Sequence, residues 1–174
     1  GLLADAFSAL PGTLCLVAPD PVESVDAAGR VQTIERGAHL HLRVRPEAPV
    51  QLLLTGHMDT VFAADHPFQS LKWLEPGVLN GPGTADMKGG IAVLKAALTA
   101  FEASPFADRL GWEIVLNSDE EVSSPGSAPL LAKARSSSTS TWPSTVSSSS
   151  FKAGYILIAS GRLKRRPKAH YSHF

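Results

Sequence analysis

The segment Val50-Gln51-Leu52-Leu53-Leu54-Thr55 decides the fold class. It is a nearly continuous apolar run between Pro49 and Gly56. Such runs are typical of strands that are buried on both faces, as in a parallel or mixed sheet covered by helices. A second run, Trp112-Glu113-Ile114-Val115-Leu116, has the same character. The two runs therefore predict two central strands.

The chain between these runs predicts how they are connected. Residues 61–85 are rich in Gly and Pro and indicate a long loop with a small hairpin near Trp73 and Val78. Residues 88–103 carry apolar side chains at three- and four-residue steps, which predicts a helix. Strand, loop, helix and strand in this order form a βαβ unit with a right-handed crossover. We therefore predict an α/β fold with a mixed, largely parallel sheet and flanking helices.

The segments around this unit complete the expected fold. Residues 2–10 and residues around 127–134 predict short helices. The stretch His39-Leu40-His41-Leu42-Arg43-Val44-Arg45 alternates polar and apolar side chains, which predicts a strand with one wet face. We expect His39 and His41 to face solvent on that strand.

Composition places the chain among globular proteins. Its 174 residues are 44% apolar and 18% charged, which is enough for one domain with a real core. No run of about 20 apolar residues is present, so we expect no membrane span. The one cysteine, Cys15, predicts a cytoplasmic location and is expected to fill the core. Because the chain starts without Met or a basic leader, we expect its natural beginning to be missing.

Charge divides the chain into two parts. Residues 1–121 hold all 16 acidic residues, whereas residues 122–174 hold half of the 16 basic residues and no acidic one. A single domain rarely separates its charges so completely. We therefore predict a folded domain over 1–134 and a Ser-rich basic tail over 135–174.

The tail itself allows several interpretations. Twelve of the fifteen residues in 136–150 are Ser or Thr, which indicates disorder or an altered reading frame. Residues 154–159 are either a strand or accidental apolar sequence. The basic residues 162–168 are typical of a solvated segment, and binding to nucleic acid or an acidic membrane is the alternative.

Polar side chains follow both predicted central strands. His57 and Asp59 come directly after the first strand, and Asp119, Glu120 and Glu121 follow the second. Asp86 stands just before the connecting helix. Because ligands bind at the carboxyl ends of parallel strands, we expect these groups to meet at one rim of the sheet. An imidazole with several carboxylates is a ligand set that suits zinc.

Each feature also has a simpler explanation when it is taken alone. His57 and Asp59 form a pattern that a hydrogen-bonded surface pair would also show. Asp86 is placed where a helix N-cap is expected. The stretch Asp119-Glu120-Glu121 has the composition of a solvated acidic turn. Their order, spacing and surroundings together favour a single site.

Three stretches carry a family resemblance: Leu53-Leu54-Thr55-Gly56-His57-Met58-Asp59-Thr60-Val61, Gly81-Pro82-Gly83-Thr84-Ala85-Asp86-Met87-Lys88-Gly89-Gly90 and Asn117-Ser118-Asp119-Glu120-Glu121. In this order they resemble the motifs of the family that contains acetylornithine deacetylase, succinyl-diaminopimelate desuccinylase and glutamate carboxypeptidase. The resemblance covers about residues 30–134 and is nearest to the glutamate carboxypeptidase-like members. It implies part of a zinc-exopeptidase catalytic domain.

The resemblance implies a role for each site residue. His57 and Glu121 would bind metal, and Asp86 would bridge two zinc ions, with Co2+ as a substitute metal. Asp59 would orient the imidazole, and Glu120 would be the general base. The implied reaction is hydrolysis of the amide bond in an N-acyl amino acid or a small peptide with a free carboxylate. The alternative is a non-catalytic remnant with an incomplete metal site.

The match to the family pattern stops before the end of the chain. The pattern needs a further carboxylate after the Glu-Glu pair, but no acidic residue follows Glu121. It also needs a late histidine, and the surroundings of His170 and His173 do not match that motif. The lid domain, which usually forms a homodimer and holds the substrate carboxylate, is missing too. The expected partner is a small-molecule or peptide substrate, not nucleic acid or membrane.

Overall fold

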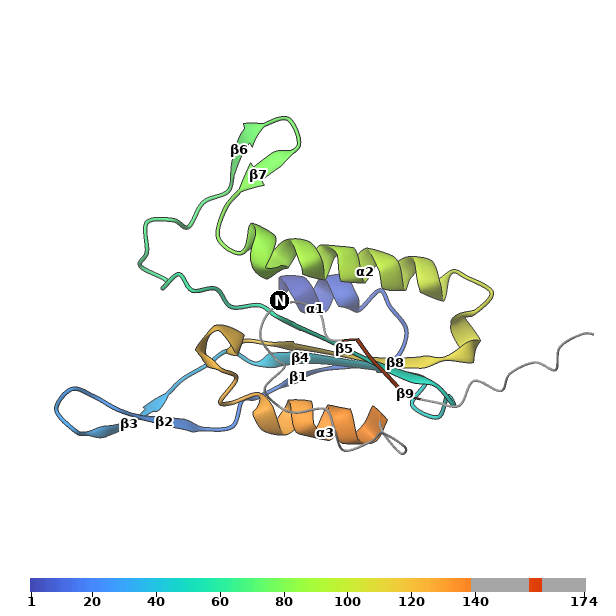
Figure 1. The fold of residues 1–174 in the computed structure, drawn as a ribbon, viewed down its shortest axis with the longest axis horizontal. Coiled ribbons are helices and arrows are strands. Elements are labelled where there is room, and N and C mark those ends of the chain that lie inside the picture. The colour runs from blue at the N-terminus through green and yellow to red at the C-terminus, as the bar shows by residue number, and fades with distance from the viewer. Residues whose placement is uncertain (139–156, 161–174) are drawn as a thin grey trace, which may run out of the picture.

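A mixed five-stranded sheet forms the centre of the molecule, and helices cover both of its faces (Figure 1). The computed structural model describes residues 1–138 and 157–160. The strands lie in the order β1 (Thr13–Val17), β4 (His39–Val44), β8 (Gly111–Asn117), β5 (Gln51–His57) and β9 (Leu157–Ser160). β5 and β8 pair in parallel, and the other three pairings are antiparallel. The predicted α/β class with a mixed sheet is therefore confirmed.

The two apolar runs form the two strands at the heart of this sheet. Every residue of β8 is buried, as expected for a strand with helices on both sides. The parallel register pairs His57 with Asn117, the last residue of each strand. Met58 N also donates to Asn117 O at 2.8 Å, just beyond the ladder. The carboxyl ends of β5 and β8 thus meet at one rim.

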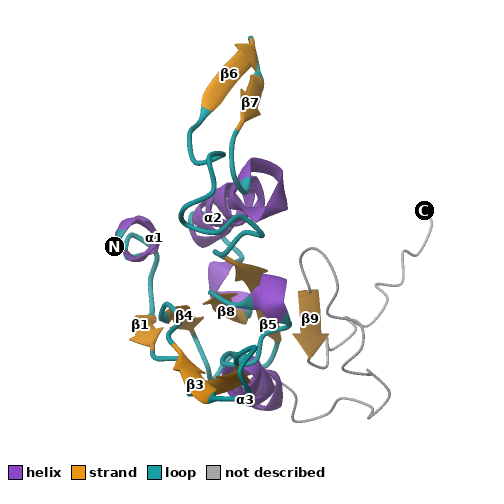
Figure 2. Ribbon diagram, turned by 90° about the vertical axis from the view of Figure 1, so that its left-hand side faces the viewer, coloured by secondary structure: helices purple, strands orange, loops and turns teal. Residues whose placement is uncertain are grey.

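Two apolar layers hold the helices to the sheet. On one face, α2 (Gly89–Glu102) and the short α1 (Leu2–Phe7) pack on the sheet, and on the other face lies α3 (Ala128–Ser138) (Figures 1 and 2). The first layer contains Phe7, Leu40, Leu42, Ile91, Leu94, Leu98, Trp112, Ile114 and Leu116. The second layer is smaller and contains Leu53, Val115 and Ala134. Within the described part of the chain, no helix is both long enough and apolar enough to cross a bilayer.

Two hairpins extend from the body of the molecule. The first joins β2 (Val22–Val25) to β3 (Val31–Ile34), and the second joins β6 (Lys72–Glu75) to β7 (Val78–Asn80). The second hairpin is the one predicted near Trp73 and Val78. It projects beyond α2, and all residues of its strands are exposed (Figures 1 and 2).

The tail enters the described structure only in part. α3 continues past the predicted domain boundary to Ser138. β9 pairs with β5 and confirms the strand interpretation for part of 154–159. The remaining Ser-rich residues, the basic segment 162–168, and His170 and His173 lie outside the described residues.

The predictions about side-chain exposure are wrong for the two histidines of β4 and for the cysteine of β1. His39 is buried, and its Nδ1 accepts a hydrogen bond from Ser118 N at 3.3 Å. His41 is partly buried, with Nε2 at 2.7 Å from Glu113 Oε1. The alternation of His39–Val44 suggested a wet face, but the neighbouring strand β8 presents a buried carboxylate to that face. Cys15 is exposed instead of filling the core, because β1 is an edge strand of the described sheet.

A partly buried ion pair joins three elements at the other end of the sheet. The guanidinium of Arg45, which follows β4, donates two hydrogen bonds to the carboxylate of Glu102 at the end of α2. Trp112 Nε1 on β8 donates to the same carboxylate at 2.7 Å. The hydrogen bond from Arg45 is the main cause that lowers the pKa of Glu102, against the opposing effect of burial.

We predict that Glu102→Gln lowers the free energy of unfolding at pH 7 by about 2 kcal/mol, because it leaves the Arg45 charge without its partner. Urea unfolding followed by the fluorescence of buried Trp112 measures this loss. Glu47→Gln, at an exposed position, is the matched control and should leave the midpoint unchanged. Equal midpoints for the two variants would contradict the prediction.

The same pair has a defined pH dependence. Since the folded-state pKa of Glu102 is lowered, its stabilising contribution is fully present above the unfolded-state pKa of about 4.3. The contribution is lost as the pH falls through the lowered folded-state pKa. The stability difference between the wild-type chain and Glu102→Gln should therefore shrink below about pH 4.

Candidate metal centre

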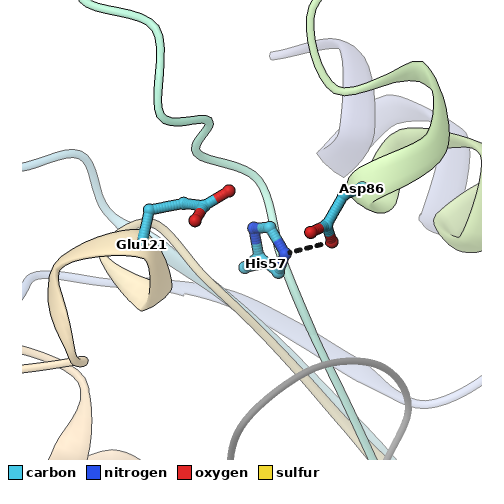
Figure 3. A group of neighbouring side chains, drawn as sticks. All are labelled: His57, Asp86 and Glu121. Atoms are coloured by element: carbon cyan, nitrogen blue, oxygen red, sulfur yellow. Dashed lines mark hydrogen bonds and ion pairs between the residues drawn. The ribbon is translucent and has the colours of Figure 1, made fainter.

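His57 occupies the last position of β5, at the rim where β5 and β8 end. Its ring is buried, with both nitrogens facing carboxylate groups (Figure 3). Nδ1 lies 3.2 Å from the backbone oxygen of Asp59 and 3.4 Å from its Oδ1. Nε2 lies 3.0 Å from Asp86 Oδ1. The imidazole is therefore held between two acidic residues from different loops.

Asp86 reaches this ring from a tight turn, η1 (Thr84–Lys88), that precedes α2. Gly83 opens the turn with φ 72°, a left-handed conformation that favours glycine. Asp86 itself is not helical, with φ −122° and ψ 100°, and its side chain is 69% exposed. α2 has Lys88 as its N-cap residue. The N-cap explanation for Asp86 is therefore wrong.

Contacts between η1 and its neighbours keep Asp86 beside His57. Met87 is buried, and its Sδ accepts a hydrogen bond from His57 N at 3.2 Å. A Cβ added to Gly56 would lie 2.7 Å from Met87 Cε, so Gly56 leaves the space that Met87 fills. Lys88 Nζ donates to Pro82 O at 2.8 Å and closes the turn. Lys88, which the sequence motif included without a chemical role, thus has a structural one.

The carboxylate pair comes from a short helical turn, η3 (Glu120–Val122), just after β8. Glu121 N donates to Asp59 Oδ2 at 3.0 Å, so the loop after β5 and the loop after β8 are hydrogen bonded to each other. One ligand atom from each of His57, Asp86 and Glu121 lies within 4.8 Å of the others (Figure 3). Glu120 lies on the same turn and is partly buried.

The crowding of acidic groups shifts the pKa of two site residues. Burial lowers the pKa of His57, but the hydrogen bond to Asp86 and the charges of Asp59 and Glu120 outweigh it, so the pKa is raised. Burial raises the pKa of Glu121, and the charges of Asp86, Glu120 and Asp59 add to this, whereas His57 opposes it. An arrangement of like charges with these shifts is typical of a site that accepts a cation.

The donor set fits a divalent transition metal. Three protein donors, one imidazole nitrogen and two carboxylate oxygens, are the number and kind found at catalytic zinc sites. Asp59 Oδ1 is buried and accepts no hydrogen bond from the described residues, but it faces His57 Nδ1. A carboxylate behind a histidine fixes the tautomer that leaves the other ring nitrogen free to bind metal. In this structure that nitrogen, Nε2, faces Asp86.

The structure brings together the residues that the sequence singled out. His57, Asp86 and Glu121 converge, and Asp59 lies directly behind the imidazole. The sequence placed Asp119 at the same rim but assigned it no role, and a solvated acidic turn was the simpler explanation for it. It is fully buried and hydrogen bonded, and no sequence pattern distinguishes it from the exposed acids beside it.

Both the sequence and the fold have counterparts among known proteins. The sequence profile described as "Peptidase family M20/M25/M40" matches residues 53–170, which is more than half of the chain. Human carnosine dipeptidase 1 has a similar fold, with a TM-score of 0.54 over 76% of this chain and 28% of that one. At 20% sequence identity, this likeness concerns the fold alone.

Two bacterial proteins illustrate the sequence similarity. Succinyl-diaminopimelate desuccinylase 2 of Shewanella loihica is 38% identical over 81 residues, which are 43% of this chain and 21% of the relative. Succinyl-diaminopimelate desuccinylase of Methylobacterium nodulans is 40% identical over 106 residues, which are 56% of this chain and 26% of the relative. The chain thus spans about a quarter of the length of the relatives it matches.

The contact between Gly56 and Met87 gives a testable prediction. Gly56→Ala should lower the free energy of unfolding by about 1–3 kcal/mol, because the added methyl group overpacks the gap. In a Met87→Ala background the same substitution should cost at least about 0.5 kcal/mol less, since the clashing side chain is gone. Chemical denaturation of the four chains in the double-mutant cycle measures both values. An equal cost in the two backgrounds would show that Met87 is not the constraint.

Proposed function

Because the chain belongs to peptidase family M20/M25/M40, a family of metal-dependent hydrolases, we propose that its rim site serves zinc-dependent hydrolysis of amide bonds. One observation carries the proposal: the ligand atoms of His57, Asp86 and Glu121 come from three separate elements and lie within 4.8 Å of one another. The resemblance of the sequence motifs supports two zinc ions in the complete enzyme. The described residues supply three donors toward them.

We assign the residues of the site to four tasks. His57 and Glu121 would hold metal, and Asp86 matches the carboxylate that the family resemblance assigns to both ions. Asp59 orients the imidazole from the Nδ1 side and holds the backbone of Glu121 at the same time. Glu120 is the general base, and its position on η3 beside Glu121 supports this assignment.

The proposed reaction is the addition of water to an amide carbonyl carbon, followed by breakage of the C–N bond. Zinc, when bound, supplies Lewis acidity that lets water attack near neutral pH and polarises the carbonyl. Glu120 takes a proton from the attacking water and passes it to the nitrogen of the leaving amine. His57 must be deprotonated at Nε2 to act as a ligand, and Asp59 favours this by facing Nδ1.

The proposed substrates are N-acyl amino acids or small peptides with a free carboxylate. The names of the two bacterial relatives, both desuccinylases, support the N-acyl class. We propose a cytoplasmic enzyme without nucleic-acid or membrane partners. The homodimer that the family resemblance implies would form through the family's lid domain.

The tail bears on whether this chain is catalytic by itself. α3 continues to Ser138, and the family match extends to residue 170. Both observations favour a native tail over an altered reading frame. Translating the parent DNA in the other two frames tests this. If another frame carried an acidic residue in the interval after Glu121, followed by a lid-like segment, the altered frame would be the better explanation.

We predict that the purified chain binds about one equivalent of zinc, since three donors are the usual protein share of one catalytic ion. His57→Ala should abolish this binding, because it removes the only nitrogen donor of the three. Asp65→Asn, which removes an exposed carboxylate from the loop after β5, is the control and should keep the metal. Elemental analysis after removal of loosely bound metal measures the stoichiometry.

Activity then separates the enzyme from the non-catalytic alternative. Hydrolysis of N-succinyl or N-acetyl amino acids by the zinc-loaded chain should fall about 100-fold or more in Glu120→Gln, while zinc content stays the same. Zinc binding without turnover would favour a non-catalytic remnant. Absence of zinc from the wild-type chain would overturn the proposed function.

A further inference from the structure

Asp119 is a fully buried carboxylate that has no part in the proposed reaction. Its Oδ2 accepts hydrogen bonds from Gly126 N at 2.6 Å and Ser127 N at 3.1 Å. Its Oδ1 accepts from Ser127 Oγ at 2.6 Å and from Asn117 Nδ2 at 3.4 Å. An uncompensated buried charge is costly, so four donors on one carboxylate indicate a built arrangement and not a chance contact.

These bonds close the loop that carries the carboxylate pair. The loop leaves β8 at Asn117 and reaches the start of α3 at Ala128, and Asp119 joins its two ends. Asn117 Nδ2 also donates to Ser124 Oγ and Ser127 Oγ, each at 3.0 Å. Ser124 N donates to Asp119 O at 2.7 Å, inside the same loop. The backbone between these anchor points therefore has little freedom to move.

The segment held in this way is η3, which contains Glu120 and Glu121. A further bond, from Glu121 N to Asp59 Oδ2 at 3.0 Å, joins this segment to the loop after β5. Asp119 immediately precedes the pair, so its position sets where both side chains leave the backbone. Because a carboxylate must lie within a fraction of an ångström of its position to share a cation, the supporting bonds matter for the site.

We propose that Asp119, with Asn117 and Ser127, is a positioning residue that places Glu120 and Glu121 for metal binding and proton transfer. The effect of Asp119 on metal binding and proton transfer rests on the proposed function. Its effect on the position of the loop does not depend on that function. The hydrogen bonds that the Asp119 carboxylate makes within the described residues go to Asn117, Gly126 and Ser127, not to His57, Asp86 or Glu121. Asp119 acts through the backbone of the loop.

The decisive comparison is between Asp119→Asn and a core variant of similar stability. Asp119→Asn keeps the shape but replaces one of the two acceptor oxygens with an NH2 group. In either orientation of the amide, a donor loses its acceptor: the backbone N–H groups of Gly126 and Ser127 on one side, or Asn117 Nδ2 on the other. Val44→Ala removes a buried side chain at the opposite end of the sheet and serves as the stability-matched control. Three readouts are measured: thermal unfolding, Co2+ affinity with its visible spectrum, and amide hydrogen exchange across residues 117–128.

We expect Asp119→Asn to weaken Co2+ binding about 10- to 100-fold and to alter the Co2+ spectrum. Exchange at the Glu121 and Ser127 amides should become faster in the metal-free chain, while β5 stays protected. Val44→Ala should lose a comparable amount of thermal stability and leave affinity, spectrum and loop exchange as in the wild-type chain. If Asp119→Asn behaves like Val44→Ala in all of these, the residue is only structural and the inference is wrong.

Two further outcomes are covered by the same design. If the wild-type chain binds no metal, the proposed function fails, and the role of Asp119 is then decided by amide exchange at Glu121. Faster exchange in Asp119→Asn than in Val44→Ala upholds the inference, and equal exchange in the two variants overturns it. If Asp119→Asn does not fold, Ser127→Ala replaces it, because it removes one donor and keeps the carboxylate. The inference is upheld if amide exchange in the loop is faster in Ser127→Ala and, where the wild-type chain binds Co2+, if the variant binds it more weakly. Exchange and Co2+ affinity equal to those of the wild-type chain overturn it.

Discussion

The parallel pairing of β5 with β8 is the constraint on which the rest of the structure depends. Two strands that run in the same direction end at the same rim, and the register places His57 directly beside Asn117. The loops that leave these two positions carry Asp59 on one side and Glu120 and Glu121 on the other. The crossover through α2 returns Asp86 to the same rim, because a helix that covers a parallel pair must begin where the first strand ends.

The site is held by two kinds of contact with different physical origins. Apolar burial fixes the sheet and α2, and Met87 extends that layer up to the backbone of His57. Beyond the sheet the loops have little apolar surface to bury, and hydrogen bonds hold them in position instead. Asp59 joins one loop to the other through Glu121 N, and Asp119 closes the second loop on itself. Polar networks of this kind are specific because each unpaired buried group is costly.

The surplus of acidic groups at the rim is itself informative. Charges of the same sign raise the pKa of Glu121 beyond the effect of burial, and they overcome the burial of His57 to raise its pKa as well. The carboxylates at the rim repel one another, and this repulsion does not stabilise the fold. A divalent cation relieves it. The chain belongs to a family of metal-dependent hydrolases, which is consistent with the proposed role for this rim.

The sequence by itself determined the central strands, the α2 helix and the hairpin after β5, because these follow from apolar periodicity and turn residues. It also indicated that His57, Asp86 and Glu121 would lie together, because polar residues next to the ends of parallel strands meet at one rim. It did not determine the environment of individual polar side chains. His39 and Asp119 are buried although their neighbours in sequence suggest exposure, and Cys15 is exposed although it lies in an apolar run. Burial depends on which elements come to lie beside a residue, and only the tertiary structure decides that. The donors that satisfy Asp119 are an example: Gly126 and Ser127 lie seven and eight residues further along the chain, and the folded loop brings them to it.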